Sequence, residues 1–442
     1  MDALKSGYPR FLTNHVVARL FEEAKNALCQ TGEEAMVFPS SDSCARAKAY
    51  LEKRTGKSGR MAEFRGLGVL IFPSEEGKVL QAYWQHTGEV VSSRLAEDAL
   101  ADQVVTRNSA EYHARLAEVM EVTPQDFYLY ESGMAAIFSA YRAATELRER
   151  KKTLQLDFPY IDALKIQEQF GAGAEFLASA RGEEFEAMLG RIQSREFAAV
   201  LCEVPSNPLL RSVDLPRLSA ACREGGTPLL VDDTVSSHHN LEILPHVDAV
   251  TTSLTKWVSG VGNVMGGSIK LNANSAFYSE LQDKIRSSNP NQCRLYARDA
   301  EVLADNASGF VNRIQKANDT GELLAEFLQS HPAVEQVWYP KYCDREQYLA
   351  LARTGAGYGG LMSFSPKSKE AAPRVYDALR WSKGPSLGTE FSLACAYTLL
   401  AHYKELDWAE SCGVPRELIR LSVGVEDAST LQESLGGALD LA

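Results

Sequence analysis

A lysine among hydroxyl-bearing and small residues is the most chemically informative feature of this sequence. The stretch from Val250 to Ile269, VTTSLTKWVSGVGNVMGGSI, places Lys256 directly after a run rich in threonine and serine. Upstream, the apolar segment PLLVDDT predicts a strand that ends on Asp232 and Asp233. A lysine can form a Schiff base with pyridoxal phosphate, a carboxylate can pair with the pyridinium nitrogen, and hydroxyl groups can meet the phosphate. A lysine taken alone is more often a solvated surface residue, but these neighbours favour a pyridoxal phosphate site.

The elements that must position these groups alternate between strand and helix patterns through residues 127–270. Such alternation predicts an α/β domain with a largely parallel sheet. Ligands of these sheets bind at the carboxyl ends of the strands. Tyr160, Asn207, Asp232 and Lys256 all follow predicted strands. We therefore expect them to meet at one edge of the sheet, which packing alone does not explain.

The segment FYLYESGMAAIFSAYR predicts a strand, a tight turn and an amphipathic helix. Ser132 can cap this helix, and the free N–H groups of Gly133 and Met134 would form a phosphate site at its start. An ordinary strand-to-helix turn explains the same residues equally well. Arg94 also stands at a predicted helix start, where the helix dipole disfavours a cation. This position suggests that Arg94 meets an anion.

Length, charge and cysteine usage exclude several classes of protein. A chain of 442 residues is too long for one core, so two or three domains are expected. The net charge of −12 argues against nucleic acid or an anionic membrane as the main partner. No apolar run approaches the ~20 residues of a membrane helix, and no secretory signal is visible. The eight cysteines lack zinc-ligand spacing and are typical of reduced thiols. We expect a soluble, cytoplasmic protein.

Other patterns carry less chemistry. Residues 1–60 are mostly helical in pattern, and residues 66–85 predict two short strands around the turn PSEEG. The run G-V-G-N-V-M-G follows a lysine and has the wrong spacing for a dinucleotide loop. His238 and His239 are adjacent, so they would not face one another on a helix, and no metal site is expected.

Several motifs, taken in order, resemble one known family. ESGMAA, EVPSNPLL, VDDT, TTSLTKWVSGVGNVMGG, GPSLGTEF and LIRLSVGVED are similar to the Cys/Met-metabolism family of pyridoxal-phosphate enzymes, the cystathionine γ-synthase group. YWQHTGEVVSSR and SGVGNVMGG resemble its fungal branch. The resemblance spans roughly residues 80–430.

The resemblance implies an overall architecture. It is that of fold type I, like aspartate aminotransferase, with a mostly parallel sheet in the large domain and a smaller α+β C-terminal domain. The implied parts are an N-terminal arm contacting a neighbouring subunit (1–105), a large cofactor domain (106–305) and a C-terminal domain (306–442). Homotetramers built from dimers with shared active sites are expected.

The resemblance also implies a role for each matching residue. Lys256 would carry the Schiff base, Asp232 would pair with the ring nitrogen and Tyr160 would stack on the ring, which makes these three the catalytic group. The remaining positions would bind phosphate (Gly133, Met134, Ser253 and Thr255), the 3-oxygen (Asn207), a neighbouring subunit's phosphate (Arg94) and the amino-acid substrate (Arg420, Ser386 and Glu390).

Some positions depart from the family pattern. The family commonly has tyrosine two residues before the arginine that matches Arg94, whereas this chain has Ser92, and Tyr83 is a candidate to supply the missing phenol. Glu390 stands where the fungal synthases usually carry asparagine. These differences lie near the substrate side and leave the second substrate open.

The implied reaction is γ-replacement on an O-acyl-L-homoserine, with O-acetyl-L-homoserine as the natural donor, through a β,γ-unsaturated ketimine. The nucleophile would be a carbon nucleophile such as a β-keto acid in secondary metabolism, or cysteine in methionine biosynthesis. γ-Elimination is a third alternative. A cofactor-free interaction module is disfavoured, because Lys256, Asp232 and Arg420 are all present.

Overall fold

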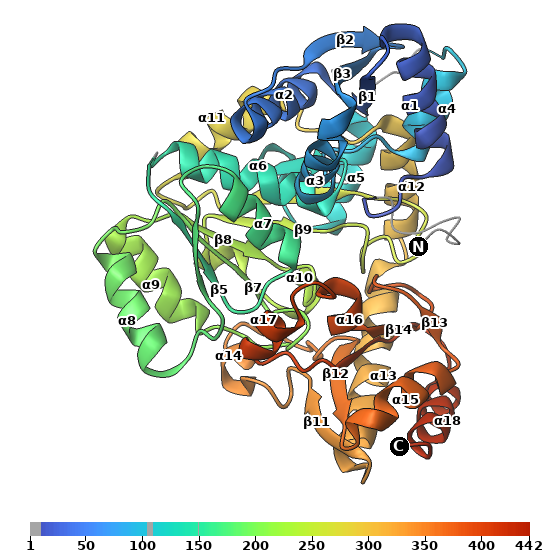
Figure 1. The fold of residues 1–442 in the computed structure, drawn as a ribbon. Helices are drawn as coiled ribbons and strands as arrows, with labels where there is room; N and C mark the ends of the chain where they lie inside the picture. Colours follow the sequence, from blue (N-terminus) through green and yellow to red (C-terminus); the bar gives the residue numbers. More distant parts are fainter. Residues whose placement is uncertain (1–9, 104–108, 149) are drawn as a thin grey trace.

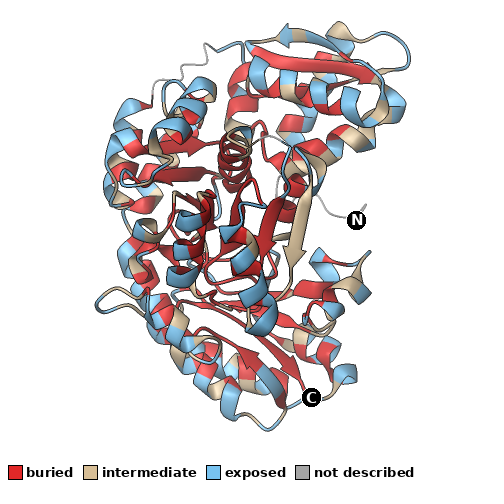
Figure 2. Cartoon of the chain, turned by 90° about the vertical axis from the view of Figure 1, so that its left-hand side faces the viewer, coloured by how far each residue is buried: buried red, intermediate tan, exposed pale blue. Residues whose placement is uncertain are grey.

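Three β-sheets, one after another along the chain, organise the molecule (Figure 1). A computed structural model describes residues 10–103, 109–148 and 150–442. The seven-stranded sheet lies between the other two, with the N-terminal sheet above it and the C-terminal sheet below it in Figure 1. Figure 2 shows that most strands of this central sheet are buried, apart from a half-buried edge strand, whereas the helices around it are exposed on their outer faces.

The central sheet is mostly parallel and has the order β4-β10-β9-β8-β7-β5-β6. Only β10 runs antiparallel to its neighbours. This arrangement confirms the α/β prediction. The strands are β4 (Phe127–Tyr130), β5 (Thr153–Leu156), β6 (Ala174–Leu177), β7 (Val200–Glu203), β8 (Leu229–Asp232), β9 (Ala249–Thr252) and β10 (Gly267–Leu271).

Side chains alternate between the two faces of the central sheet, as a strand period of two requires. Leu201 and Leu230 pack in one cluster with α6 and α7, whereas Val200 and Val231 pack in another with α8 and α9. By the same alternation, Glu203 and Asp232 face the α6 and α7 side. The helices around the sheet are α5 (Ala110–Val119), α6 (Gly133–Glu146), α7 (Ile161–Gln169), α8 (Gly182–Gln193), α9 (Leu215–Gly225), α10 (Ser237–Asn240), α11 (Tyr278–Ser288) and α12 (Ala297–Ala307), with short 3-10 turns η2 (Pro124–Asp126) and η3 (Leu244–His246).

Residues 15–100 fold into a structure with its own hydrophobic core, which we call the N-terminal unit. Its sheet has the order β1-β3-β2 and is antiparallel. The predicted strand over the second half of 66–85 is wrong: that segment is a helix that buries Leu80, Tyr83 and Trp84 at helical spacing. The elements are α1 (His15–Leu28), β1 (Glu33–Phe38), α2 (Ser41–Thr55), β2 (Arg60–Phe64), β3 (Leu67–Pro73), η1 (Ser74–Glu76), α3 (Gly77–Thr87) and α4 (Ser93–Leu100).

The C-terminal sheet has the order β11-β12-β15-β14-β13 and is antiparallel except between β13 and β14. The long helix α13 and the last helix α18 pack together against it. The domain boundaries near residues 105 and 305 remain predictions. The elements are α13 (Phe310–Ser330), β11 (Val334–Trp338), α14 (Arg345–Leu349), β12 (Leu361–Pro366), η4 (Lys369–Ala371), α15 (Ala372–Ala378), β13 (Ser382–Lys383), β14 (Leu393–Ala396), α16 (Tyr397–Ala401), α17 (Leu406–Ser411), β15 (Ile419–Ser422) and α18 (Ala428–Leu439).

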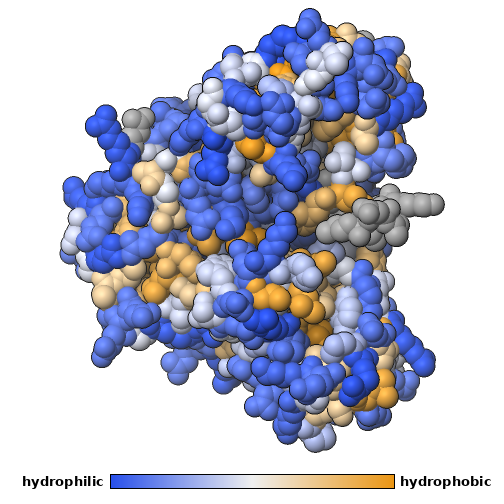
Figure 3. Space-filling model, in the orientation of Figure 1, coloured by the Kyte–Doolittle hydropathy of each residue, from blue (hydrophilic) through white to orange (hydrophobic). Residues whose placement is uncertain are grey.

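The face of the molecule in Figure 3 is mostly hydrophilic, with apolar residues gathered mainly between its upper and lower parts. Within the described residues, no helix combines the length and the apolar character needed to cross a bilayer.

A buried ion pair joins three neighbouring strands of the central sheet. Lys270 on β10 donates to the Asp233 carboxylate at 3.2 Å, and both side chains are at most 5% exposed. Thr252, the last residue of β9, donates to the other oxygen of Asp233 at 2.5 Å. Asp233 therefore links β9 and β10 to the end of β8. Its side chain lies on the face of the sheet opposite to that of Asp232.

Lys270→Met should lower the free energy of unfolding by about 3–5 kcal/mol, because it leaves the Asp233 carboxylate buried without its cation. Arg217→Met is the matched control, since Arg217 pairs with Glu186 at the surface and such pairs contribute at most ~1 kcal/mol. Urea unfolding, followed by circular dichroism at one protein concentration, compares the two variants. Equal losses in both would contradict a structural role for the buried pair.

Candidate active site

The predicted site residues meet where the parallel strands of the central sheet end. Asp232 is the last residue of β8, and Lys256 lies in the turn that follows β9. Tyr160 follows β5 and precedes α7, and Asn207 lies in the loop after β7. The fold therefore brings these residues, which are far apart in the sequence, to the edge of the sheet where ligands of α/β domains bind.

Asp232 is an acid whose ionisation depends on its surroundings. Its two carboxylate oxygens accept hydrogen bonds from the Thr234 N–H at 2.9 Å and from the Thr251 hydroxyl at 3.0 Å. Burial raises the pKa of the Asp232 carboxyl, and the hydrogen bonds from Thr234 partly offset this effect. A cation placed beside it would stabilise its charged form.

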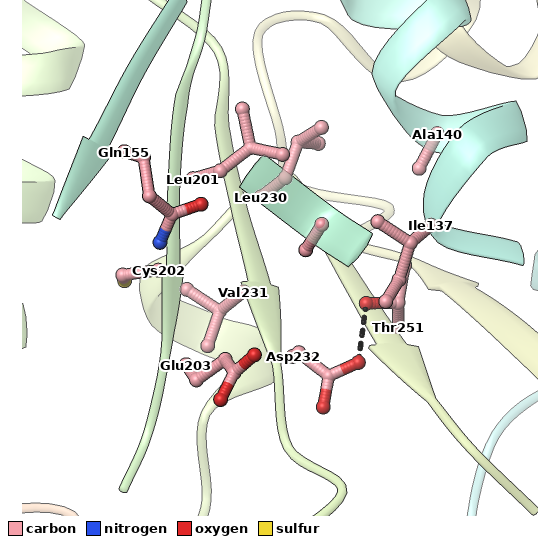
Figure 4. Close-up of a pocket in the computed structure, with 11 residues that line it drawn as sticks. Ile137, Ala140, Gln155, Leu201, Cys202, Glu203, Leu230, Val231, Asp232 and Thr251 are labelled. Carbon is pink, nitrogen blue, oxygen red and sulfur yellow. Dashed lines mark hydrogen bonds between the residues drawn. The ribbon is translucent and has the colours of Figure 1, made fainter. Parts of the chain in front are cut away.

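Glu203 stands next to Asp232 and was not assigned a role from the sequence. The two residues are register partners on β7 and β8, and Figure 4 shows both carboxyl groups lining the same cavity. Burial and the neighbouring Asp232 raise the pKa of Glu203. Its position at a strand end, one strand from Asp232, was the signal that could have identified it.

The Glu203 carboxyl also holds the backbone of two predicted site residues. It accepts a hydrogen bond from the Tyr160 N–H at 2.6 Å, and the Asn207 N–H is a second donor. One buried side chain thus fixes the loops after β5 and β7 relative to each other.

Lys256 lies beside a residue of the C-terminal part of the chain. Its Nζ donates to the Ser386 hydroxyl at 3.0 Å, and the lysine is only half-buried. Two predicted site residues separated by 130 positions are therefore in direct contact.

Arg420 on β15 is a buried cation, 3% exposed, at the same place. It donates to Asn207 Oδ1 at 3.0 Å and to the carbonyls of Pro385 and Ser386 at 2.5 and 2.9 Å. The Tyr397 ring lies 5.1 Å from its guanidinium carbon. Its Nε is buried and has no hydrogen-bond partner among the described residues. A buried donor of this kind favours an anionic ligand.

The start of α6 lies against the segment that carries Lys256. Ser132 caps the helix by accepting from the Ala135 N–H at 3.1 Å. A Cβ at Gly133 would lie 2.6 Å from Ser253 Cβ, so only glycine allows this approach. Met134, 3% exposed, occupies the first turn. The Thr255 hydroxyl accepts from the Gly266 N–H at 3.1 Å, which closes the loop between residues 255 and 266.

Several predicted residues lie elsewhere. Arg94 donates to Asp299 at 3.0 Å and to the Asn263 carbonyl at 3.1 Å within its own chain. Ser92 caps α4. The suggestion that Tyr83 supplies the missing phenol is wrong, because Tyr83 is fully buried in the N-terminal unit and donates to Glu89.

Glu390 is exposed on a loop next to the site. Its N–H donates to the Gly260 carbonyl at 2.8 Å, and its own carbonyl accepts from the Val425 N–H at 3.0 Å. The backbone of residue 390 is thereby fixed to the loop that follows Lys256, whereas its side chain reaches solvent.

Arg10 is a second residue that the sequence did not reveal. It is 3% exposed and donates to the Tyr160 hydroxyl at 2.5 Å and to the Asp162 carboxylate at 2.9 Å. His86 also contacts Asp162, at 2.7 Å. An N-terminal residue thus holds the phenol of Tyr160, and no local pattern around Arg10 indicates this contact.

The arrangement combines an amine, a buried acid and a buried guanidinium with a helix N-terminus. Within the described residues, no group of three or more His, Cys, Asp or Glu residues could hold a metal ion. The groups present suit an organic cofactor with an aldehyde, a cationic ring nitrogen and a phosphate.

Solved structures similar to this chain share its fold. A methionine γ-lyase from Micromonospora echinospora aligns with a TM-score of 0.63 and 24% identity, over 75% of this chain and 86% of its own. A cystathionine γ-synthase from Xanthomonas oryzae pv. oryzae also gives a TM-score of 0.63 and 24% identity, over 74% of this chain and 83% of its own.

Curated relatives extend this similarity. The cystathionine gamma-synthase-like enzyme iboG2 of Amanita muscaria is 30% identical over 100% of this chain and 91% of its own length. The cystathionine gamma-synthase of Neurospora crassa is 40% identical over 73% of this chain and 53% of its own length.

Two family models match, in adjacent parts of the chain. Residues 16–92 match the N-terminal domain of fungal trans-sulfuration enzymes. Residues 105–440 match the model described as Cys/Met metabolism PLP-dependent enzyme. This chain therefore belongs to the Cys/Met-metabolism family of enzymes that use pyridoxal 5'-phosphate, the family that its motifs predicted.

Proposed function

We propose that this enzyme catalyses γ-replacement on O-acetyl-L-homoserine, joining its Cγ to a carbon nucleophile such as a β-keto acid. The observation that supports an amino-acid donor is the contact of Lys256 with Ser386, whose carbonyl also binds Arg420. This contact places an amine beside a buried guanidinium that suits an α-carboxylate. An amino-acid substrate bound by its carboxylate would present its Cα to the amine.

The residues of the site fit pyridoxal phosphate. Asp232 would pair with the ring nitrogen, which offsets the cost of its burial. The Gly133 and Met134 N–H groups, with Ser253 and Thr255, would hold the phosphate at the start of α6. Tyr160 and Asn207, both fixed by Glu203, would flank the ring. When bound, the cofactor supplies an electron sink for the carbanion at Cα.

Lys256 is the residue that would move protons. Its Nζ would take the proton from Cα and then a proton from Cβ. The electron pair left at Cβ would expel the acyloxy group from Cγ as a carboxylate. The Ser386 hydroxyl, 3.0 Å from Nζ, would hold the amine in position. Acetate leaves far more readily than hydroxide, which supports an O-acyl donor.

Arg420 would orient the substrate. A planar guanidinium can bind a carboxylate through two parallel hydrogen bonds. Its carbonyl and amide partners fix the plane of the group before substrate arrives. This preorganisation would align the Cα–H bond for removal by Lys256.

The choice of nucleophile rests on departures from the family pattern. Ser92 replaces a common tyrosine, and it serves as the cap of α4. Glu390 replaces the asparagine usual in fungal synthases and is exposed beside the site. The second candidate is cystathionine synthesis with cysteine, favoured by the similarity to the N. crassa enzyme. γ-Elimination is the third.

We also propose that two copies of the chain share active sites within a larger homo-oligomer. Leu399, Leu400 and Tyr403 expose 46%, 55% and 75% of their surface on and just after α16, beside the site. Arg94, at the start of α4, pairs with Asp299 of its own chain. It would reach the phosphate of a partner subunit in the oligomer.

Purified enzyme given O-acetyl-L-homoserine with acetoacetate should form a carbon-linked adduct, identified by mass spectrometry. A parallel reaction with cysteine tests the second candidate, and Lys256→Ala, expected to be inactive, is the control. Cystathionine as the sole product would replace the proposal with the second candidate. A product of 2-oxobutanoate alone would favour elimination.

Arg420→Lys should lower kcat/KM for the amino-acid donor by about 10- to 100-fold, mainly through KM, because lysine cannot bind a carboxylate in the same bidentate way. Arg416→Lys is the matched control, since Arg416 pairs with Asp407 and Glu410 near the surface. Steady-state kinetics measure both variants. An unchanged KM in Arg420→Lys would assign the carboxylate site to another residue.

In the cofactor-free protein, the contribution of Glu203 to stability should fall as the pH rises above the ordinary carboxyl range, about 4.3. Glu203 has a pKa raised by burial and by Asp232, so the folded state binds its proton more tightly than the unfolded state. The stability it contributes is full below its unfolded pKa and is lost as pH rises through its folded pKa.

Glu203→Gln should remove this component, which is at most about 1.4 kcal/mol per pH unit for one proton. In this variant, Asp232, whose pKa is also raised by burial, would still make stability fall with rising pH. Unfolding curves from pH 5 to 8 test the effect, with Glu63→Gln, at an exposed position of β2, as the control. A pH dependence identical to that of the wild type would show that Glu203 is ionised in the folded protein.

A further inference from the structure

The turn at the start of α6 is supported from behind by the N-terminal unit. The Ser132 hydroxyl donates to the Gly88 carbonyl at 2.8 Å while its oxygen caps α6. Ser132 is fully buried, so this contact is shielded from water. The single hydroxyl therefore connects residue 88, which follows α3, to the helix start that would hold phosphate.

Gly88 approaches this turn more closely than any other residue type could. Its φ of 67° lies in the left-handed region. A Cβ at this position would lie 2.3 Å from Ser132 Oγ, 2.7 Å from Met134 Cβ and 2.9 Å from the Ala135 nitrogen. A side chain at residue 88 would therefore have to displace the turn itself.

A buried ionic network runs beside this backbone contact. Arg294 donates to Glu89 at 3.0 Å and to Glu131, the residue before Ser132, at 2.6 Å. Arg46 on α2 and the Tyr83 hydroxyl also contact Glu89. Glu89 and Glu131 expose only 1% and 7% of their side chains.

The electrostatics of the network keep Glu89 charged. Burial alone would raise the pKa of its carboxyl, but Arg46 and Arg294 together hold the pKa well below its usual range. Hydrogen bonds between charged groups are stronger and more directional than neutral ones. Arg294 thus joins Glu89 of the N-terminal unit to Glu131, the residue directly before the α6 turn.

We propose that Gly88 and Glu89 are positioning residues for cofactor phosphate, acting through Ser132 and through Arg294 and Glu131. The N-terminal unit thereby completes the cofactor site of its own chain. The proposal rests on the phosphate site described above, but not on the identity of either substrate. Gly88 and Glu89 act on the α6 turn and not on the strands that would hold the ring, so their effect should depend on the phosphate group.

The test compares the dissociation constants of pyridoxal 5'-phosphate and of pyridoxal, which lacks the phosphate, for the cofactor-free protein. Gly88→Ala should weaken pyridoxal phosphate binding by roughly 10-fold or more, because the turn must move. Pyridoxal binding should change by less than about 3-fold, since its ring contacts lie on other strands. Tryptophan fluorescence measures both constants.

Gly56→Ala is the matched control. Gly56 also ends a helix of the N-terminal unit in the left-handed region, with φ of 72°, but no atom lies within 4 Å of its ideal Cβ. It therefore carries the same backbone strain without touching the turn, and both constants should stay at wild-type values.

Glu89→Gln provides a second variant if Gly88→Ala does not fold. It keeps the shape of the side chain but removes the charge shared by Arg46 and Arg294, and should show the same phosphate-dependent loss. Equal losses for both ligands, or no loss for either, would overturn the proposal. If the wild-type protein bound pyridoxal as tightly as pyridoxal phosphate, the start of α6 would not be a phosphate site. That result would refute both the phosphate site and the present proposal.

Discussion

The site depends on one buried cation that has to be satisfied. Arg420 lies on the C-terminal sheet, and its acceptors come from the loop after β7 and from the segment before β14. An unpaired guanidinium at this depth would cost several kcal/mol, on the order of 3–5. The bond to Asn207 therefore fixes the C-terminal sheet against the central sheet at the edge where the strands end. The carbonyl and hydroxyl of Ser386 extend the same contact to Lys256.

The central sheet separates two kinds of acid by strand alternation alone. Asp232 faces the α6 and α7 side and lines the cavity with Glu203, whereas Asp233 faces the opposite side and meets Lys270. Adjacent residues at the end of β8 thus have different surroundings: Asp232 lines the cavity, and Asp233 is paired with a buried lysine. Asp233 has its cation within the sheet, and Asp232 is the acid proposed to pair with the cofactor.

Much of this arrangement could be predicted from the sequence. The parallel-strand rule placed Tyr160, Asn207, Asp232 and Lys256 at one edge, because each follows an apolar strand of ordinary length. The N-terminal unit was harder. The segment of α3 is rich in residues that favour strands, such as Val79, Tyr83 and Trp84, and only the spacing of its buried residues shows the helix.

Long-range charge pairs could not be predicted. Arg10 meets Tyr160 across 150 positions, and Arg294 meets Glu89 across 205. A charged residue in a sequence usually indicates a solvated surface, and nothing local distinguishes a residue that the fold will bury. Glu203 differs, because the strand-end rule that selected Asp232 applied to it as well.

The order of these residues along the chain has a consequence for biosynthesis. A nascent chain emerges from its N-terminus, so Gly88, the α6 turn and Lys256 leave the ribosome well before Ser386 and Arg420. The residues proposed to hold the cofactor can thus assemble while those proposed to bind the amino acid are still untranslated. A chain interrupted before β15 would lack the guanidinium proposed to bind substrate, while the residues proposed to hold the cofactor would already be present.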